Sequence, residues 1–402
     1  MNQTAQKIAE AIAGQGAISF ARFMELALYC PVCGYYETED DTIGRRGDYY
    51  TSVSVGSLFG ELLGFQFAEW MGGGVGRAEG GGAETGARQR EPIPEAGRMS
   101  EVIEAGAHGG QLARDILEWF RRRRSALFEG LQYWIVEPSG RRQEWQRRNL
   151  GEFGAKVRWV KGLGEIDSQT GGSDPRDLAP GSGGGGFRIL FCNELLDAMP
   201  AHRLGWDASR QAWFEWGVTV SGGRFAWTRL EQRESTSADL SRFVSRFTSQ
   251  APPGLPDGFT VEVCPAAADW WGQAAGVVKR GVLMAVDYGL TAEELWVPER
   301  AHGTLRGYSG HRLSADPLAS PGEQDLTSHV NFSVIREAGE AGGAQTEGLM
   351  TQEKFLTNIA ARIWTGEEGF GEWTRERTRQ FQTLTHPEHL GRAFRVLVQS
   401  RG

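Results

Sequence analysis

Residues 102–111 read Val-Ile-Glu-Ala-Gly-Ala-His-Gly-Gly-Gln and decide the fold of this chain. Val102 and Ile103 predict the end of a short buried strand. The glycines that follow predict a tight turn. Apolar residues at helical spacing then predict a helix over residues 111–121. Strand, glycine turn and helix in this order are typical of a βαβ unit in a parallel sheet.

Further strands and helices extend the same pattern along the chain. Short apolar runs at 133–136, 157–160 and 187–192 predict further buried strands, with a charged helix over 143–150. This alternation predicts an α/β fold with a Rossmann-like core. Further strands are predicted at 260–264 and 281–287. A hairpin within 211–230, centred on Ser221-Gly222-Gly223, adds an antiparallel element to the core. Helices are predicted before the core, at 5–13, 18–29 and 55–71.

The expected organisation is an N-terminal helical region, residues 1–71, that contributes to a ligand site and precedes a core over 98–402. The core carries inserted elements at about 205–260 and 290–350, which include the antiparallel hairpin. Glycine-rich stretches at 72–97, 170–186 and 338–350 are interpreted as surface insertions without catalytic residues. The chain from Gln352 onward is expected to be mostly helical.

Composition excludes several function classes. The 402 residues carry 43 basic and 51 acidic side chains, and the net charge of −8 disfavours a nucleic-acid binder. No apolar stretch approaches the length of a membrane span. The first residues resemble neither a signal peptide nor a transit sequence, so a cytoplasmic protein is expected. Four cysteines in such a chain do not indicate a disulfide framework.

The glycine turn indicates a nucleoside ligand. Gly106 and Gly110 let the backbone approach a ligand closely, and Glu137, after the next strand, can accept hydrogen bonds from ribose hydroxyls. Glu104 precedes the glycines, where a carboxylate suits a cationic group such as the ammonium of S-adenosylmethionine (SAM). Because His108 replaces the middle glycine of the usual pattern, SAM, a dinucleotide and a purely structural turn all stay open at this point.

Several longer segments resemble the MidA-like family, which includes the mitochondrial complex I assembly methyltransferases. They are residues 33–36, 44–64, 193–202, 287–289, 303–307, 311–312 and 321–327. The resemblance implies a SAM-dependent, seven-stranded methyltransferase fold, with arginine methylation known for the mitochondrial member. It further implies that Gly47, Asp48, Thr51 and Ser52 cover the cofactor. The chain departs from the family at Ala107 and His108, and at Asn331, where many members have Asp.

Candidate catalytic residues follow the later strands. Asn193, Glu194 and Asp197 come after the fourth strand, where carboxylates could orient a guanidinium acceptor. An acidic helix start is the alternative reading for these residues. Asp287 ends another strand, and His311 could relay a proton or bind substrate. Leu163, after the third strand, is assigned to the cofactor site.

Cys30 and Cys33 have the spacing of half a zinc site or of a redox pair. No second Cys/His pair at matching spacing lies nearby, so no metal site is expected.

The leading hypothesis is a SAM-dependent methyltransferase acting on a protein side chain, with arginine favoured by resemblance. One alternative is a catalytically weak SAM-fold protein that assists assembly of a partner. Another is a small-molecule O- or N-methyltransferase. A nicotinamide-dependent oxidoreductase is disfavoured, because no hydride-transfer residues are recognisable.

Overall fold

The computed structural model describes residues 2–38, 51–73, 100–169, 186–230, 238–310, 312–365 and 370–402. The chain divides into two compact units, each built from separate stretches of sequence. Unit 1 comprises Met1–Tyr50, Leu196–Trp270 and Tyr288–Ile335, and unit 2 comprises Thr51–Leu195, Trp271–Asp287 and Arg336–Gly402.

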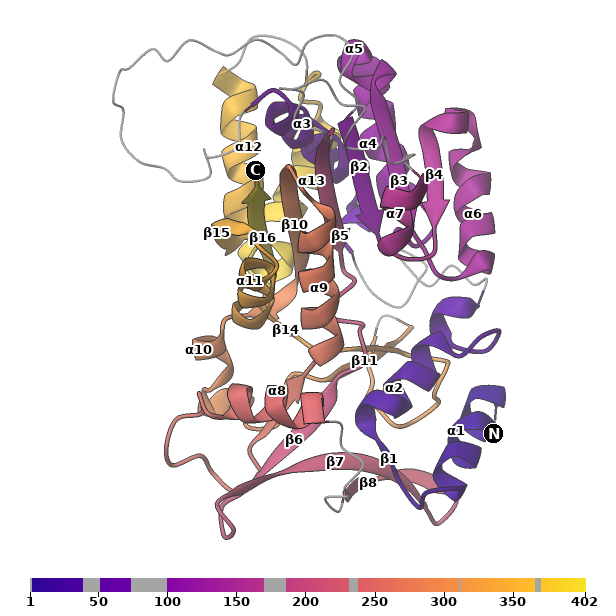
Figure 1. The fold of residues 1–402 in the computed structure, drawn as a ribbon, viewed down its shortest axis with the longest axis vertical. Helices are drawn as coiled ribbons and strands as arrows, with labels where there is room; N and C mark the ends of the chain where they lie inside the picture. The colour runs from indigo at the N-terminus through magenta and orange to yellow at the C-terminus, as the bar shows by residue number, and fades with distance from the viewer. Residues whose placement is uncertain are drawn as a thin grey trace. The chain divides into compact units, whose positions relative to one another are not determined.

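A twisted sheet with the strand order β15-β16-β10-β5-β2-β3-β4 forms the centre of unit 2, and Figure 1 shows β4 and β15 at its two edges. Its strands are β2 Ser100–Ala105, β3 Leu131–Val136, β4 Val157–Val160, β5 Phe187–Asn193, β10 Gly281–Leu290, β15 Gln345–Thr351 and β16 Phe394–Arg401. The five strands from β4 to β10 are parallel, whereas β15 runs antiparallel to β16. Every residue of β2 and β3 is buried, as expected for parallel strands covered on both faces.

Helices connect these strands and follow them in the sequence. They are α3 Leu58–Met71, α4 Gln111–Arg123, α5 Ser125–Glu129, α6 Gly140–Leu150, α7 Gly164–Gln169, α9 Pro265–Val277, α11 Phe332–Ala341, α12 Gln352–Thr365 and α13 Arg375–Thr385. Shorter turns are η2 Val53–Val55, η3 Gly151–Lys156 and η5 Pro387–Gly391. The apolar face of α4 is buried and its last turn is basic, which suits the helix dipole and explains Arg121–Arg123 without a binding role.

Unit 1 combines helices with antiparallel sheets. Its elements are α1 Gln3–Ala13, β1 Ile18–Ser19, α2 Phe20–Tyr29, η1 Tyr35–Glu37, β6 His202–Asp207, β7 Ala212–Ser221, β8 Arg224–Arg229, α8 Ala238–Thr248, β9 Thr260–Val263, α10 Ala292–Leu295, η4 Pro298–Arg300, β11 Arg306–Ser309, β12 Arg312–Leu313, β13 Asp325–Thr327 and β14 Val330–Asn331. The sheet order is β1-β7-β6-β9, and β8 pairs with β7 through the predicted hairpin. Ser19 caps α2, as its sequence position predicts, because its hydroxyl accepts from the N–H of Arg22.

Residues 338–350 correct one prediction. Instead of a glycine-rich insertion, they form the end of α11, a turn at Gly342-Gly343 and most of β15. The expectation of a mostly helical C-terminus is also incomplete, because β16 follows α12 and α13 and lies between β15 and β10. The other two glycine-rich stretches fall mainly outside the described residues.

Candidate active site

Four chain turns meet at one edge of the sheet in unit 2. Parallel pairing sets Ala105 opposite Val136 and Cys192, and sets Asn193 opposite Val286. These paired positions lie towards the carboxyl ends of the strands, where open α/β sheets bind their ligands, although β10 itself continues to Leu290. The predicted residues Gly106, Glu137, Glu194 and Asp287 come directly after those positions.

The glycine turn keeps its shape although His108 replaces a glycine. Gly106 and Gly110 have φ angles of 77° and 83°, and His108 itself adopts the left-handed conformation with φ 45°. The amide of Gln146 donates to the His108 carbonyl at 2.9 Å and holds it in place. A Cβ on Gly106 would lie 3.0 Å from Leu195 Cδ1, so the turn packs directly against the end of β5.

Glu104 is buried, with 2% of its surface exposed. The Tyr133 hydroxyl donates to Glu104 Oε2 at 2.7 Å. Burial raises the pKa of Glu104 to about 7, against the opposing effect of the Tyr133 hydrogen bond, and the charge of Asp115 adds to the increase. A bound ammonium group would stabilise the ionised carboxylate, so this residue fits the cation of SAM. Glu137 is buried as well, with 1% of its surface exposed.

Glu137 is held rigidly after β3. Its Oε1 accepts from the N–H of Ser139 at 2.9 Å, and Oε2 accepts from the amide of Gln146 at 3.2 Å. Arg142 forms an ion pair with Glu137 at 3.2 Å. Ser139, Gln146 and Arg142 therefore fix the orientation of the carboxylate that the sequence assigns to the ribose hydroxyls. Leu163 is buried shortly after β4.

The turn after β5 places Glu194 in a strained backbone conformation, with φ 51°. Its N–H donates to Val286 O at 2.9 Å, and the next N–H, that of Leu195, donates to Asp287 Oδ2 at 3.1 Å. Asp287 is fully buried, so its carboxylate anchors the turn from β10. The Glu194 side chain is only half-buried at the same edge.

Ser52 joins this cluster from the N-terminal part of unit 2. Its N–H donates to Glu194 Oε1 at 3.3 Å, and Asn193 Nδ2 donates to the same oxygen at 3.0 Å. The Ser52 hydroxyl donates to Gln352 at 3.0 Å. Thr51 forms a compact turn with Ser54, whose N–H donates to Thr51 Oγ1 at 2.9 Å. Ser52, Asn193, Glu194 and Asp287 are thus brought together within unit 2.

Asp197 belongs to unit 1, where it is buried and its carbonyl accepts from Ser328 N–H at 3.0 Å. Its charge helps to raise the pKa of Tyr36, after the larger effects of burial and of Asp325. Gly47, Asp48 and His311 lie outside the described residues.

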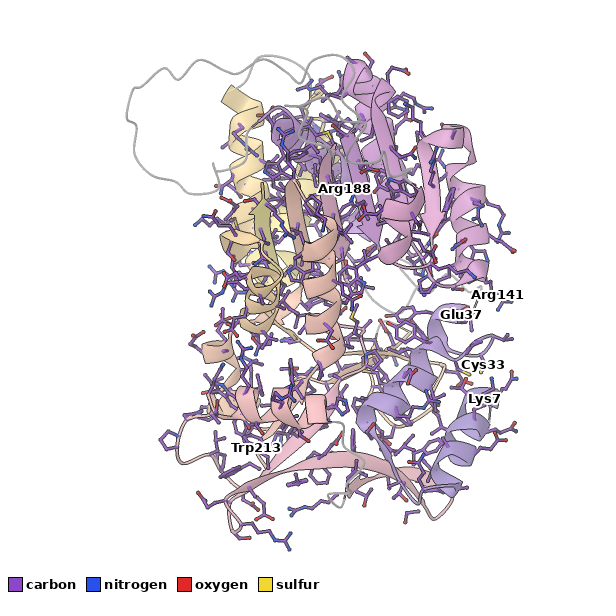
Figure 2. The ribbon with its side chains drawn as sticks, viewed as in Figure 1. Lys7, Cys33, Glu37, Arg141, Arg188 and Trp213 are labelled. Carbon is purple, nitrogen blue, oxygen red and sulfur yellow. The ribbon has the colours of Figure 1, made fainter. Side chains whose placement is uncertain are left out.

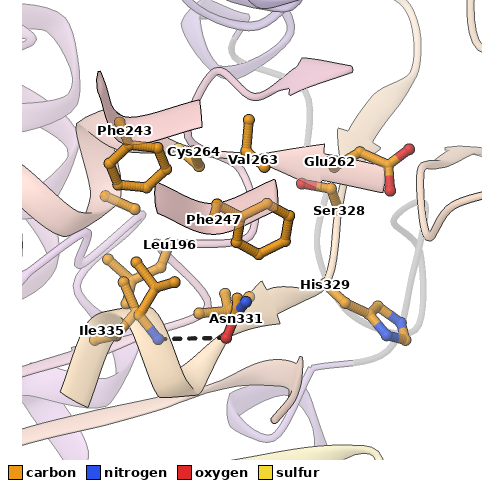
Figure 3. A pocket seen from close by; sticks show the side chains of 13 residues that line it. Leu196, Phe243, Phe247, Glu262, Val263, Cys264, Ser328, His329, Asn331 and Ile335 are labelled. Carbon is orange, nitrogen blue, oxygen red and sulfur yellow. Dashed lines mark hydrogen bonds between the residues drawn. The ribbon is translucent and has the colours of Figure 1, made fainter. Parts of the chain in front are cut away.

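A pocket in unit 1 contains polar residues whose role the sequence did not indicate (Figure 3). Its cavity volume is about 30 Å³, and it is lined by Phe243, Phe247, His329 and Asn331 among others. Burial, with smaller effects from Arg306 and Arg300, lowers the pKa of His329 to about 4. Asn331 Oδ1 accepts from the N–H groups of Ser333 and Val334 at 3.1 and 3.3 Å. This residue therefore caps α11, and a signal for that role was present in its position before the helix.

Comparison with protein families matches residues 90–350 to the family described as "Putative S-adenosyl-L-methionine-dependent methyltransferase". The chain belongs to this family. The family, and the S-adenosyl-homocysteine bound to a structural relative described below, show that this chain is a SAM-dependent methyltransferase, in agreement with the sequence prediction.

Curated relatives include the mitochondrial protein arginine methyltransferase NDUFAF7 of Danio rerio. It is 27% identical over 376 residues, covering 88% of this chain and 75% of that protein. The Mus musculus protein of the same name is 26% identical, covering 95% of this chain and 81% of that protein. These mitochondrial relatives contradict the expected cytoplasmic localisation, which rested only on the residues at the start of the chain.

A solved relative supports the fold over nearly the whole chain. It is a Burkholderia thailandensis protein, described as a "likely methyl transferase" and bound to S-adenosyl-homocysteine. Its TM-score is 0.73 at 28% identity, and the match covers 99% of this chain and 92% of that one. A native crystal structure from the same organism gives a TM-score of 0.71 at 27% identity, covering 99% and 91%.

Within the described ranges, no helix is both long and apolar enough to cross a membrane. In the same part of the chain, no group of three or more His, Cys, Asp or Glu side chains is arranged to hold a metal ion.

Proposed function

We propose that this methyltransferase transfers the methyl group of SAM to an arginine side chain of a protein. The names of the curated relatives support a protein arginine acceptor. The position of Glu194 carries the proposal within the structure. This half-buried carboxylate lies at the carboxyl edge of the sheet, and its Oε1 is oriented by Ser52 N–H and Asn193 Nδ2.

The cofactor would be held by the residues around the glycine turn. Glu104 suits the ammonium, Glu137 suits the ribose hydroxyls, and the left-handed conformation of Gly106 provides the tight backbone turn. When bound, SAM supplies an electrophilic methyl group on a sulfonium. The retained geometry at His108 supports an active enzyme over a catalytically weak assembly protein, because the turn does not collapse at the substituted position.

The acceptor side of the proposal rests on carboxylate chemistry. A guanidinium presents paired N–H donors, and a carboxylate binds them while holding one nitrogen in a defined direction. Glu194 is suited to this role because two donors fix one of its oxygens, which limits its rotation. Methyl transfer requires such orientation, since the attacking nitrogen must lie in line with the methyl–sulfur bond.

The test is incubation of the purified chain and a cell extract with SAM carrying a labelled methyl group. The proposal expects label in protein and methylarginine after acid hydrolysis, with both lost in Glu194→Gln. Label on another amino acid would overturn the arginine assignment. Label confined to the low-molecular-weight fraction would instead favour the small-molecule alternative and overturn the protein acceptor.

A further inference from the structure

Cys30 and Cys33 form a close thiol pair in unit 1 that the methyltransferase chemistry does not use. Cys30 ends α2, and the Cys33 thiol donates to Cys30 Sγ across 3.0 Å. Both cysteines are in the reduced form. Figure 2 shows Cys33 near Lys7 of α1, and Lys7 Nζ lies 3.2 Å from Cys30 Sγ.

The backbone around the pair is already closed into a turn. The N–H groups of Cys33 and Gly34 both donate to Cys30 O, at 3.1 and 2.7 Å. A Cβ on Gly34 would lie 2.5 Å from Cys30 N, so only glycine permits this close return of the chain. The Thr4 hydroxyl also donates to Cys33 O. A disulfide has a sulfur–sulfur distance of about 2.05 Å, so forming one here requires only a small approach of two side chains.

Lys7 partly offsets an environment that disfavours the Cys30 thiolate. Burial and the hydrogen bond with Cys33 raise the pKa of Cys30, and the Lys7 ammonium opposes that increase through its own hydrogen bond and its charge. Cys33 is the more exposed thiol, whereas Cys30 is 3% exposed. An accessible thiol beside a buried partner next to a cation is the arrangement expected of attacking and resolving cysteines.

The other two cysteines, Cys192 and Cys264, occupy different surroundings in the fold. Cys192 is fully buried within β5. The Cys264 thiol donates to Pro200 O at 3.3 Å, and burial raises its pKa to about 12. The chain therefore contains two internal controls for thiol reactivity. A zinc site fits this pair less well than a thiol–disulfide pair does, since no third ligand joins the two cysteines among the residues described.

We propose that Cys30 and Cys33 are a reversible thiol–disulfide site that reacts with low-molecular-weight disulfides such as glutathione disulfide. The Cys33 thiolate attacks one sulfur of glutathione disulfide, that S–S bond breaks, and one glutathione leaves. The Cys30 thiolate then attacks the Cys33 sulfur of the mixed disulfide and expels the second glutathione. The two cysteine protons end on the two departing glutathiones, so the protein is oxidised by two electrons and the glutathione disulfide is reduced.

The experiment uses the full reduced chain, equilibrated in glutathione buffers of increasing oxidation. Acid quenching, alkylation of the remaining thiols and peptide mass spectrometry then identify each cysteine. The expected result is joint loss of the Cys30 and Cys33 thiols as one intramolecular disulfide. Cys192 and Cys264 should remain thiols and be alkylated at every degree of oxidation. Cys30→Ser should accumulate a stable glutathione adduct on Cys33. Full alkylation of both thiols in the most oxidising buffer would overturn the proposal, as would pairing of either one with Cys192 or Cys264.

Lys7 variants separate charge from packing. Lys7→Met keeps most of the side-chain volume and removes the charge, and we expect disulfide formation about threefold slower because the thiolate fraction falls. Lys7→Arg keeps the charge and should react like the wild type. Equal rates in all three proteins would overturn the role assigned to Lys7.

Discussion

The hydroxyl of Tyr133 on β3 donates a hydrogen bond to Glu104 Oε2 on β2 at 2.7 Å, and both side chains are buried. A carboxylate in this position loses its hydration and gains only one neutral hydrogen-bond donor in return. Its ionised form is therefore higher in free energy, relative to the protonated form, than in water. The pKa of Glu104 near 7 reflects that cost. A cationic ligand group is the natural compensation, so the same residue connects protein stability with cofactor binding.

The stability of the ligand-free protein should therefore fall as pH rises. Glu104 has a folded-state pKa raised from 4.5 to about 7, so its contribution to the free energy of unfolding is present below pH 4.5 and is lost as pH rises towards 7. The loss relative to Glu104→Gln, which cannot ionise, is on the order of 3 kcal/mol. Urea unfolding of both proteins across this range measures it. A constant difference between them would contradict the assignment.

Glu104→Gln should also weaken SAM binding by about 1.5–3 kcal/mol, because a charged hydrogen bond to the ammonium is replaced by a neutral one. Titration calorimetry measures the change. Glu101→Gln is the matched control, since Glu101 lies on the same strand but binds Trp134 and Arg188 instead. That variant should lose stability and keep its SAM affinity. Equal SAM affinity in wild type and Glu104→Gln would remove Glu104 from the cofactor site.

Glu194→Gln should bind SAM almost normally and transfer methyl groups about two orders of magnitude more slowly, as for loss of one preorganised electrostatic contact. Single-turnover transfer from labelled SAM gives the rate. Glu215→Gln provides the control, because Glu215 is also a half-buried carboxylate but pairs with His202 in unit 1. Loss of SAM affinity or of folding in Glu194→Gln would instead mark a structural residue.

Gly106→Ala should destabilise the fold by about 1–3 kcal/mol, because an L-residue is strained at φ 77° and its Cβ would press on Leu195. The shift at Leu195 should also reduce SAM affinity. Gly109→Ala lies in the same turn but meets nothing closer than 3.7 Å, the distance to Asn149 Nδ2. Thermal unfolding with and without SAM compares the two variants. Equal effects would show that the turn tolerates a side chain at both positions.

Asp287→Ala should cost about 1–3 kcal/mol of stability, since the part-buried N–H of Leu195 loses its acceptor, the carboxylate of the fully buried Asp287. We assign Asp287 a positioning role, so the maximal rate should fall more than SAM affinity. Asp287→Asn keeps an oxygen for the Leu195 N–H and should recover much of the rate. If Asp287→Asn transfers methyl groups as slowly as Asp287→Ala, the negative charge of Asp287 itself takes part in methyl transfer.

The parallel core was predictable from sequence because its strands are continuous apolar runs separated by strong glycine signals. The strand at 157–160 and the cap at Ser19 agree with their predicted positions. The structure of residues 338–350 was not predictable, because their glycine content outweighed the weak alternation of apolar and polar residues in β15. The strand conformation of β15 depends on its pairing with β16, which is distant in sequence. For the same reason, β16 was hidden within a segment expected to be helical.

The identity of the site residues was predictable from the sequence, whereas their burial and their contacts were less so. Glu104 and Glu137 occupy the turns that their motifs indicated, yet their burial depends on neighbours such as Tyr133 and Gln146, which no local pattern reveals. Asp287 was predicted to end its strand, but β10 continues to Leu290, and only the fold shows that the Asp287 carboxylate accepts from the N–H of Leu195. The contact of Ser52 with Glu194 joins residues 142 positions apart.

The order of the central sheet has a consequence for how the chain is made. β16 follows both β10 and β15 in the chain, yet its place in the sheet is between them. Until residues 394–401 have emerged from the ribosome, the edge of β10 that pairs with β16 is open, and the nascent protein carries an unpaired apolar strand edge. Vectorial synthesis thus delays closure of this sheet until β16 has emerged, and chaperone occupancy on stalled chains should drop once β16 is exposed.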